Sequence, residues 1–243
     1  MKPWKLHKAA IRKDLIYWDK FPVKFISIAV PKTATTSFSQ LQVASFAGSR
    51  SGRHKGPIGG RTHYDLHEHR EVLLTATDPQ IVKLGGEEWF AEAYKFGFVR
   101  NPWDRAVSLY ENRKDRHQCK TFEEFVDKYD GASFTQSNPS YHANQIDWFK
   151  SRETNVVMAD YIGRYENLEA DIIHILGKLN LAVPKIIPHI GRPEAKVRSA
   201  RLPPRETKDK PYQEYYTKHT REVILQKCAE DIEYFQYTFE KES

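Results

Sequence analysis

The chain has 243 residues, of which 40% are hydrophobic and 29% charged, a composition that excludes disordered and fibrous proteins. Its formal net charge of +6 suits an anionic ligand but is too small for a general nucleic-acid binder. Two distant cysteines, Cys119 and Cys228, exclude a disulfide framework. No stretch approaches the roughly 18 apolar residues of a membrane span, and the charged N-terminus lacks a signal peptide's apolar core. A cytoplasmic protein is therefore expected.

The first predicted element is a buried parallel strand at 23–30, which follows a basic and aromatic arm at 1–22. A helix is expected to begin at Thr35 or Thr36. The glycine-rich, basic stretch 47–61 is expected to be a loop.

Further along the chain, Asp65 is a candidate N-cap for a helix at 65–74, and 77–90 resembles a turn-rich connection. The sequence YKFGFV at 94–99 predicts a second strand, followed by a helix that begins near Pro102.

The second half of the chain continues the alternation of strands and helices. Thr121 and Glu124 predict a capped short helix, and a third strand is expected around 156–162, with a helix after it and helical periodicity near the C-terminus. The proline-rich, basic segment 192–210 is expected to be a loop. This alternation predicts a single α/β domain with a central, mostly parallel sheet flanked by helices.

The turn after the first strand reads PKTATTSF, from Pro31 to Phe38. A helix N-terminus favours a phosphate or sulfate, because its backbone N–H groups are unpaired and carry partial positive charge. Lys32 adds a full charge, and the hydroxyls add donors. The lysine precedes the hydroxyls, so the Walker pattern of ATP and GTP sites is absent. The alternative is a hydroxyl-capped turn with a solvated lysine.

The second strand runs into a similar turn, FVRNPWDRAVSLY. Arg100 at the strand's end can clamp a phosphate bidentately, and Ser108 can reach the same group from the helix. The alternative is that Arg100 pairs with Asp104 while Ser108 lies on the helix surface. Two anion-binding turns at two strand ends indicate a ligand with two separated phosphate groups.

Together, PKTATTSF and FVRNPWDRAVSLY resemble the two signature segments of sulfotransferases that use 3′-phosphoadenosine 5′-phosphosulfate (PAPS). YIGRYENLEADI and the C-terminal segment resemble the carbohydrate branch, which includes Golgi-type and bacterial sulfotransferases of family 2. The segment VPKTATTSF is similar to the corresponding loop of the heparan-sulfate uronyl 2-O-sulfotransferases. The resemblance covers most of 23–239 and implies a sulfotransferase domain at 23–243 with a P-loop-NTPase-like sulfotransferase fold.

The resemblance also implies residue roles. Lys32 would contact the bridging and 5′-phosphate oxygens, Arg100 and Ser108 would hold the 3′-phosphate, and Tyr165 would lie near the adenine. The residues implied to cradle the 5′ end are Thr33, Ala34, Thr35, Thr36 and Ser37. Because alanine stands inside this turn, we expect no positive φ at Ala34.

Sulfuryl transfer to a hydroxyl needs a base for the acceptor's proton, and histidine suits neutral pH. In the resembling family, a histidine just before the helix between the two nucleotide segments serves as base, and His63 matches it. His142 is the second candidate and Glu166 the third. No metal is expected, because HYDLH lacks a third ligand.

The resemblance thus predicts an O-sulfotransferase with PAPS as donor, adenosine 3′,5′-bisphosphate (PAP) as product, and a glycan or other polyol as acceptor. No nucleic-acid or membrane partner is expected. The loops 48–61 and 192–210 are expected to shape the acceptor cleft. One alternative is a phosphotransferase with a divergent phosphate loop, although no carboxylate clearly holds magnesium. Another is a non-catalytic polyanion-binding module that uses these basic loops.

Overall fold

The computed structural model describes residue 15 and residues 23–33, 65–112, 119–129, 144–183 and 210–240. The predicted loops at 47–61 and 192–209, the helix start at Thr35 or Thr36, and the arm at 1–22 apart from Leu15 lie outside the described residues.

At the centre of the fold is a three-stranded, fully parallel sheet in the order β1-β2-β3. Its strands are β1 (Phe25–Ile28), β2 (Tyr94–Val99) and β3 (Tyr161–Arg164). The first two predicted strands are confirmed, and β2 has the predicted bounds. All residues of β2 except Tyr94 are buried, as a central strand covered on both faces requires.

Helices cover both faces and both ends of this sheet. Those in the described parts of the chain are α3 (Leu66–Thr75), α4 (Pro79–Val82), α5 (Gly86–Glu92), α6 (Pro102–Asn112), α7 (Phe122–Asp127), α8 (Leu168–Lys178), α9 (Lys218–Lys227) and α10 (Ala229–Phe235), with the 3₁₀ turns η2 (Ile146–Phe149), η3 (Tyr165–Asn167) and η5 (Tyr212–Tyr215).

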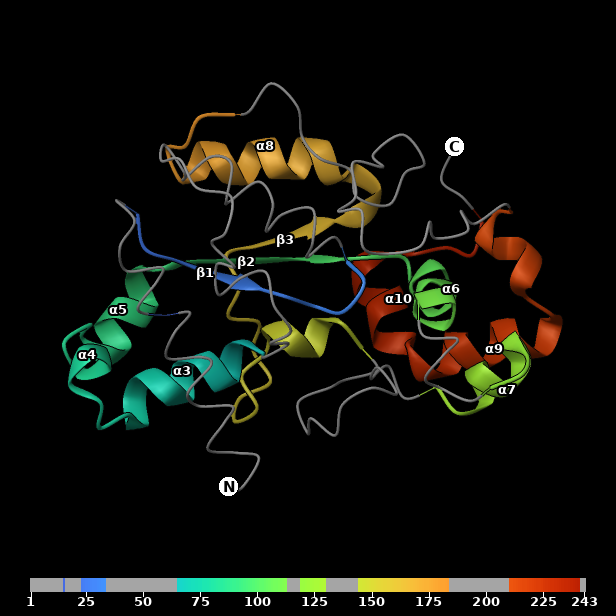
Figure 1. Cartoon of the computed structure of the whole chain (residues 1–243), viewed down its shortest axis with the longest axis horizontal. Coiled ribbons are helices and arrows are strands. Elements are labelled where there is room, and N and C mark those ends of the chain that lie inside the picture. Colours follow the sequence, from blue (N-terminus) through green and yellow to red (C-terminus); the bar gives the residue numbers. More distant parts are fainter. Residues whose placement is uncertain are drawn as a thin grey trace, which may run out of the picture.

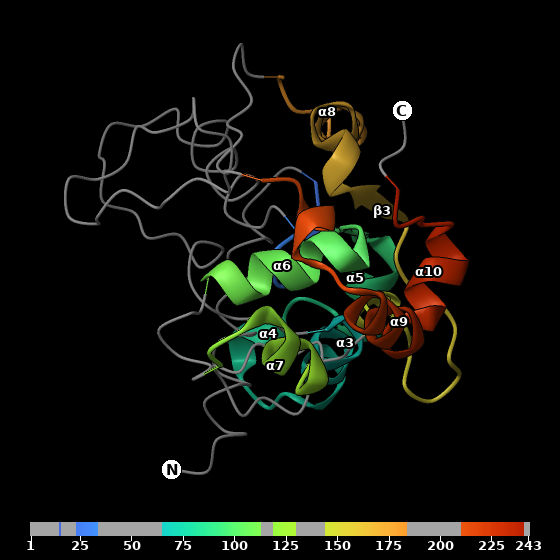
Figure 2. The ribbon, with the colours of Figure 1, turned by 90° about the vertical axis from the view of Figure 1, so that its right-hand side faces the viewer.

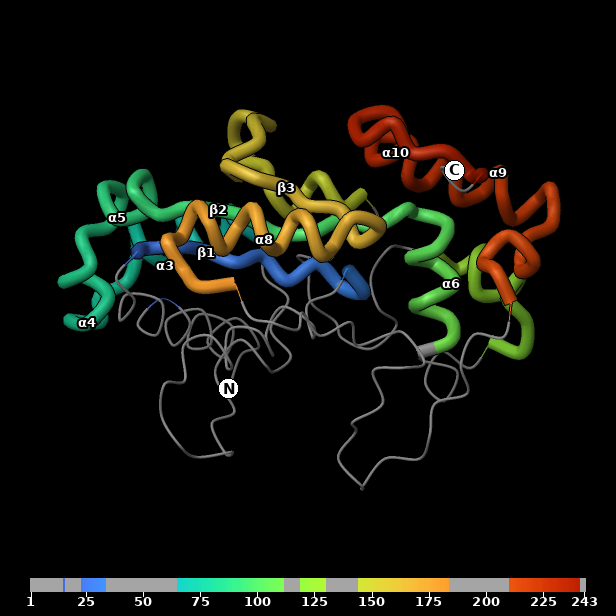
Figure 3. The backbone as a smooth tube through the Cα atoms, turned by 90° about the horizontal axis from the view of Figure 1, so that it is seen from above, coloured from blue at the N-terminus to red at the C-terminus, as the bar shows by residue number. Residues whose placement is uncertain are grey.

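The helices form layers around the strands. In Figure 1, α8 lies over one face, whereas α3 and η2 lie over the other. Figure 3 shows α8 running along the strands when the sheet is seen from above. Figure 1 shows α6, α7, α9 and α10 gathered at one end of the molecule, where β2 leads into α6, and Figure 2 views the molecule from that end. The predicted α/β domain with a parallel sheet flanked by helices is confirmed.

The third strand lies later in the chain than the sequence predicts. β3 covers Tyr161–Arg164 rather than 156–162, and its pairing with β2 begins opposite Phe96. Val157 instead forms an isolated antiparallel bridge with Lys150. The apolar residues at the start of the predicted range therefore belong to a local turn, not to the sheet.

Residues 77–90 hold the two short helices α4 and α5, where the sequence predicts a turn-rich connection. Asp78 caps α4 by accepting the Gln80 N–H at 2.9 Å, and a proline occupies the first turn. Gly85 and Gly86 have φ values of 106° and 57°, a backbone conformation that glycine adopts at little cost. The prediction of turns is right for this glycine pair and wrong for the segments beside it.

Cap geometry confirms two predicted helix starts. The Asp65 carboxylate accepts the Glu68 N–H at 2.9 Å, and the Glu68 carboxylate accepts the Asp65 N–H at 3.0 Å, which completes a capping box. Thr121 accepts the Glu124 N–H at 3.2 Å. The Glu124 carboxylate binds the Lys120 N–H at 2.7 Å, so the return bond lies one residue ahead of the predicted cap.

Gly97 allows the 3₁₀ turn η2 to approach the middle of the sheet. It lies between Ile28 of β1 and Ile162 of β3. A Cβ at this position would lie 2.6 Å from the Phe149 ring and 2.8 Å from the Ile28 carbonyl oxygen. The buried ring of Phe149 therefore fills the space that a side chain on β2 would occupy.

Candidate functional site

The two predicted anion-binding turns meet at the carboxyl ends of β1 and β2. Arg100 follows β2 directly, and its Nη1 donates to the backbone carbonyl of Lys32, beyond β1, at 3.3 Å. Adjacent parallel strands end at the same edge of a sheet, where open α/β sheets bind their ligands. Lys32 and Arg100, which are far apart in the chain, therefore lie together at this edge of the sheet.

Arg100 is buried, and its guanidinium is held on several sides. Nε donates to Asp104 Oδ2 at 2.7 Å, and Nη2 lies 2.5 Å from the same oxygen. The Tyr165 ring stacks beneath the guanidinium, with Cζ 4.0 Å from its centroid. Burial acts to lower the pKa of Arg100, but the Asp104 charge, with Tyr165 and Glu166, raises it above the ordinary value.

The sequence allows Arg100 either to bind a phosphate or to pair with Asp104, and the structure contains the Asp104 pair. Contacts to described residues use three of the five guanidinium N–H donors: Nε and Nη2 with Asp104, and Nη1 with the Lys32 carbonyl. A guanidinium with two further N–H donors can pair with Asp104 and a phosphate together.

One face of α6 points towards the first turn. Arg105, which is fully buried, donates through Nε to the Pro31 carbonyl at 3.2 Å. Asp104 is linked to the same turn because it accepts from Arg100, which also donates to the Lys32 carbonyl. Ser108 comes three residues after Arg105 and four after Asp104, spacings that make it a neighbour of each of them on the helix. Ser108 is buried, not a surface residue.

The first turn differs in detail from what the sequence predicts. Lys32 is half-buried and adopts a left-handed backbone conformation with φ 70°, which costs a residue with a side chain about 1–2 kcal/mol. The buried Thr33 hydroxyl donates to the Val30 carbonyl at 3.0 Å. This hydroxyl closes the turn, whereas the sequence predicts that it helps to cradle the 5′ end of a nucleotide.

The end of β3 supports the second turn. Glu166 accepts the Asn101 N–H at 2.7 Å, and the Tyr237 hydroxyl donates to its other carboxylate oxygen at 3.3 Å. Loss of water around the carboxylate raises the pKa of Glu166, although the residue stays exposed in part; the Asn101 N–H and Arg100 act in the opposite direction. Glu166 thus has structural partners, which does not favour it as the base.

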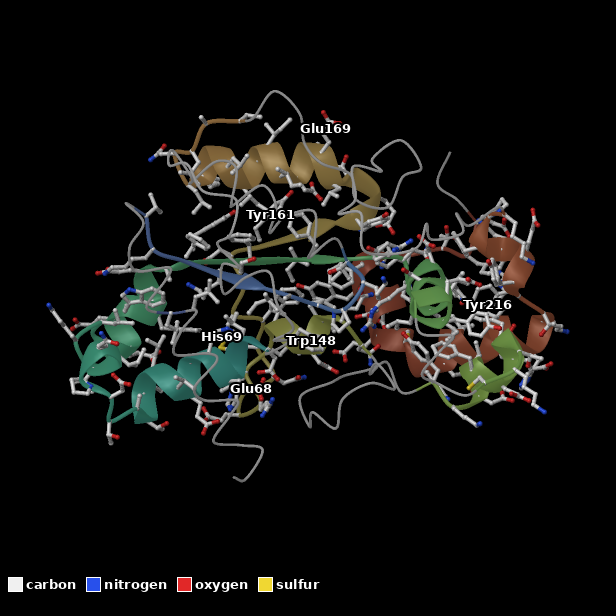
Figure 4. The ribbon with its side chains drawn as sticks, viewed as in Figure 1. Glu68, His69, Trp148, Tyr161, Glu169 and Tyr216 are labelled. Carbon is white, nitrogen blue, oxygen red and sulfur yellow. The ribbon has the colours of Figure 1, made fainter. Side chains whose placement is uncertain are left out.

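The C-terminal segment also packs on the start of α6. Asn101 Nδ2 donates to the Thr238 carbonyl at 2.8 Å, and the Phe239 ring meets Trp103 edge to face at 5.6 Å. The Tyr216 hydroxyl, labelled in Figure 4, donates to the Trp103 carbonyl at 2.8 Å. Together with Glu166, these two segments hold the residues that follow Arg100.

The two candidate bases, His63 and His142, lie outside the described residues, as do Ala34, Thr35, Thr36 and Ser37. His63 precedes by two residues the capping box that begins α3. Arg152 pairs with the buried Asp65 of that cap and lies 3.9 Å from the Glu68 carboxylate. Figure 4 shows Glu68 and His69 on α3 below the sheet. The backbone is thus well anchored just after His63.

The sequence-based interpretation missed two buried residues that serve this site, Arg105 and Gln145. Arg105 stands three residues before Ser108, a helical spacing that indicates a shared face. Gln145 binds both backbone polar groups of Arg100, at 2.9 and 2.7 Å, but lies far from it in the chain. No local pattern could have identified Gln145.

Within the described residues, no group of three or more His, Cys, Asp or Glu side chains is placed to hold a metal ion. Over the same ranges, every helix is too short or too polar to cross a membrane.

Two comparisons show what this chain is similar to. An uncharacterized protein of Archaeoglobus fulgidus is 36% identical over 101 residues, a match that covers 40% of this chain and 75% of that protein. The family model described as "Sulfotransferase family" matches residues 17–238, which include both anion-binding turns, the capped helix α3 and the C-terminal helices. The narrower likeness to heparan-sulfate uronyl 2-O-sulfotransferases stays a prediction. The chain belongs to the sulfotransferase family.

Proposed function

We propose that this protein transfers the sulfuryl group of PAPS to an acceptor hydroxyl of a carbohydrate or another polyol. One observation carries the proposal: Arg100 donates to the Lys32 carbonyl at 3.3 Å, so both predicted anion-binding turns lie side by side. A nucleotide with phosphate groups at its 5′ and 3′ positions needs two such turns. Family membership supports sulfuryl transfer in general.

The residues at this edge of the sheet fit such a nucleotide. Arg100 keeps its charge despite burial, because its pKa is raised. The 11-residue helix α6 begins two residues after Arg100; Asn101 Oδ1 accepts its Trp103 N–H at 3.1 Å, and the positive end of its dipole favours an anion nearby. The half-buried Lys32 supplies the second charge on the neighbouring turn. Tyr165 offers an aromatic surface beside Arg100, where an adenine ring can pack.

When bound, PAPS supplies a sulfuryl group joined to its 5′-phosphate. Lys32 would stabilise the negative charge that develops on that phosphate as the sulfur–oxygen bond breaks. Arg100 and Ser108 would fix the 3′-phosphate and so align the sulfur with the acceptor oxygen. His63 would take the acceptor's hydroxyl proton on an imidazole nitrogen as the new oxygen–sulfur bond forms. None of these proposed roles requires a metal ion.

The acceptor is proposed from the resemblance to the carbohydrate branch. The basic segments 48–61 and 192–210 are the parts of the chain that we expect to shape its binding cleft. A cytoplasmic location also stays a prediction.

Calorimetric titration with PAP, ATP and AMP tests the nucleotide assignment. We expect PAP to bind at least tenfold more tightly than ATP or AMP, because one charge-assisted contact with the 3′-phosphate exceeds the 1.4 kcal/mol that a factor of ten requires. Preference for ATP would instead favour a phosphotransferase. Transfer of ³⁵S-labelled sulfate from PAPS to a polyol panel tests turnover, and tight polyanion binding without any transfer would favour a non-catalytic binding module.

A further inference from the structure

Gln145 holds the backbone of Arg100 as a neighbouring strand would. The Arg100 N–H donates to Gln145 Oε1 at 2.9 Å, and Gln145 Nε2 donates to the Arg100 carbonyl at 2.7 Å. Gln145 is fully buried. The two bonds also determine the orientation of the side-chain amide, because a flipped amide would face an N–H with its own N–H and a carbonyl with its own carbonyl.

Asp231 of α10 holds this amide from the other side. Its Oδ2 accepts the Gln145 backbone N–H at 2.7 Å and the Gln145 Nε2 at 3.0 Å, while Oδ1 accepts the Ile146 N–H at 2.9 Å. Asp231 is fully buried, and a buried carboxylate is tolerated where N–H donors surround it. In Figure 1, α10 lies near the end of the sheet where β2 leads into α6.

Hydrogen bonds link Asp231 of α10 to Gln145, and Gln145 to Arg100, which is the residue proposed to bind the 3′-phosphate. Arg100 is the first residue after β2, so ladder pairing within the sheet ends just before it. Gln145 extends that pairing by one residue. A guanidinium that must meet a phosphate with two parallel N–H bonds depends strongly on the position of its own backbone.

We propose that Gln145, braced by Asp231, is a positioning residue that sets Arg100 for recognition of the nucleotide's 3′-phosphate. This inference rests on the proposed function. It goes beyond that function because it assigns selectivity for the 3′-phosphate to two buried side chains outside both predicted turns. Their loss should weaken 3′-phosphate recognition and spare the 5′ end, which Lys32 is proposed to serve.

The test compares the affinities for PAP and AMP, which differ by the 3′-phosphate. In Gln145→Glu the Nε2 donor to the Arg100 carbonyl is lost and a second carboxylate faces Asp231. We expect the PAP-to-AMP affinity ratio to fall about tenfold, the equivalent of one net charge-assisted hydrogen bond, with AMP affinity changed less than about twofold. Gln226→Glu makes the same chemical change at an exposed position of α9 and should leave the PAP-to-AMP affinity ratio unaltered.

Two further variants keep the outcome interpretable. If Gln145→Glu fails to fold, Asp231→Asn keeps the side-chain shape but replaces an acceptor oxygen with a donor, and its ratio should fall in the same direction. In an Arg100→Ala background, Asp231→Asn should change the ratio no further, because the group being positioned is gone. Equal losses of PAP and AMP affinity, or an unchanged ratio in a folded variant, would overturn the inference. A wild-type protein without PAP preference would instead contradict the proposed function.

Discussion

The guanidinium of Arg100 donates to the backbone carbonyl of Lys32 at 3.3 Å, so the end of β2 is bonded directly to the turn after β1. The same guanidinium pairs with Asp104 and stacks on Tyr165. Arg100 therefore couples the two turns and also meets the residue that follows β3.

Replacing Arg100 with lysine should abolish discrimination between PAP and AMP. A lysine keeps one charge but cannot reach Asp104, the Lys32 carbonyl and a phosphate with the fork of donors that arginine provides. We expect PAP affinity to fall about 100-fold, since hydrogen bonds to charged groups are worth roughly 1.5–3 kcal/mol each. Calorimetric titration of both nucleotides measures this change. Retained PAP preference in Arg100→Lys would show that the 3′-phosphate binds elsewhere.

Lys32→Ala and Lys32→Gly separate the charge of Lys32 from its backbone conformation. Both remove the ammonium group, so sulfate transfer should fall about 100-fold or more in each. Lys32 has φ 70°, which glycine adopts without strain, so the glycine variant should be about 1 kcal/mol more stable than the alanine variant. Transfer assays and denaturant unfolding measure the two effects. Full activity in Lys32→Ala would refute the proposed charge role.

The proposed base is tested by replacing the two candidate histidines separately. His63→Ala should lower the rate of transfer by about 10²–10⁴-fold, the usual contribution of a general base, while PAP affinity stays unchanged because the nucleotide contacts are proposed for other residues. His142→Ala is the matched control and should retain most of the rate. A large rate loss confined to His142→Ala would move the role of base to that residue.

The parts of the site that the sequence predicted are those whose signals are local. Arg100 stands between an apolar strand and a proline-started helix, and this pattern marks a strand end whatever the rest of the fold. Gln145 and Asp231 carry no such signal, because their roles exist only once distant segments pack together. The left-handed conformation of Lys32 was also unpredictable, because a lysine gives no sequence signal for a positive φ.

The fold shows the same division. The bounds of β2 follow from a mostly apolar run, with Lys95 as its charged member, that is buried on both faces, whereas the start of β3 depends on where Val157 pairs. That residue forms a bridge with Lys150 outside the sheet. Periodicity within 156–162 cannot reveal this competition between a local turn and the sheet, because both use extended backbone.

His69 should make the protein less stable in acid. Burial lowers the pKa of His69 below 6.5, while its bond and proximity to Asp65 act in the opposite direction. Between the lowered folded value and 6.5 the unfolded chain binds more protons, so stability falls as the pH drops through this window. His69→Asn removes the titration, so its Tm should fall less than that of the wild type between pH 8 and pH 5. Equal falls in Tm would contradict a neutral buried His69.

Gly97 should be the least replaceable glycine among those that the structure describes. In Gly97→Ala the new Cβ would lie 2.6 Å from the buried Phe149 ring and 2.8 Å from the Ile28 carbonyl, and Ile28 is held in place because β1 pairs with β2. Overpacking of this kind costs about 1–3 kcal/mol. Gly177→Ala, on α8, is the matched control: its Cβ meets nothing within 4 Å, and alanine should stabilise the helix by about 0.5–1 kcal/mol. Urea unfolding of both variants measures the difference. Equal stabilities would mean that Phe149 does not pack against the centre of β2 in solution.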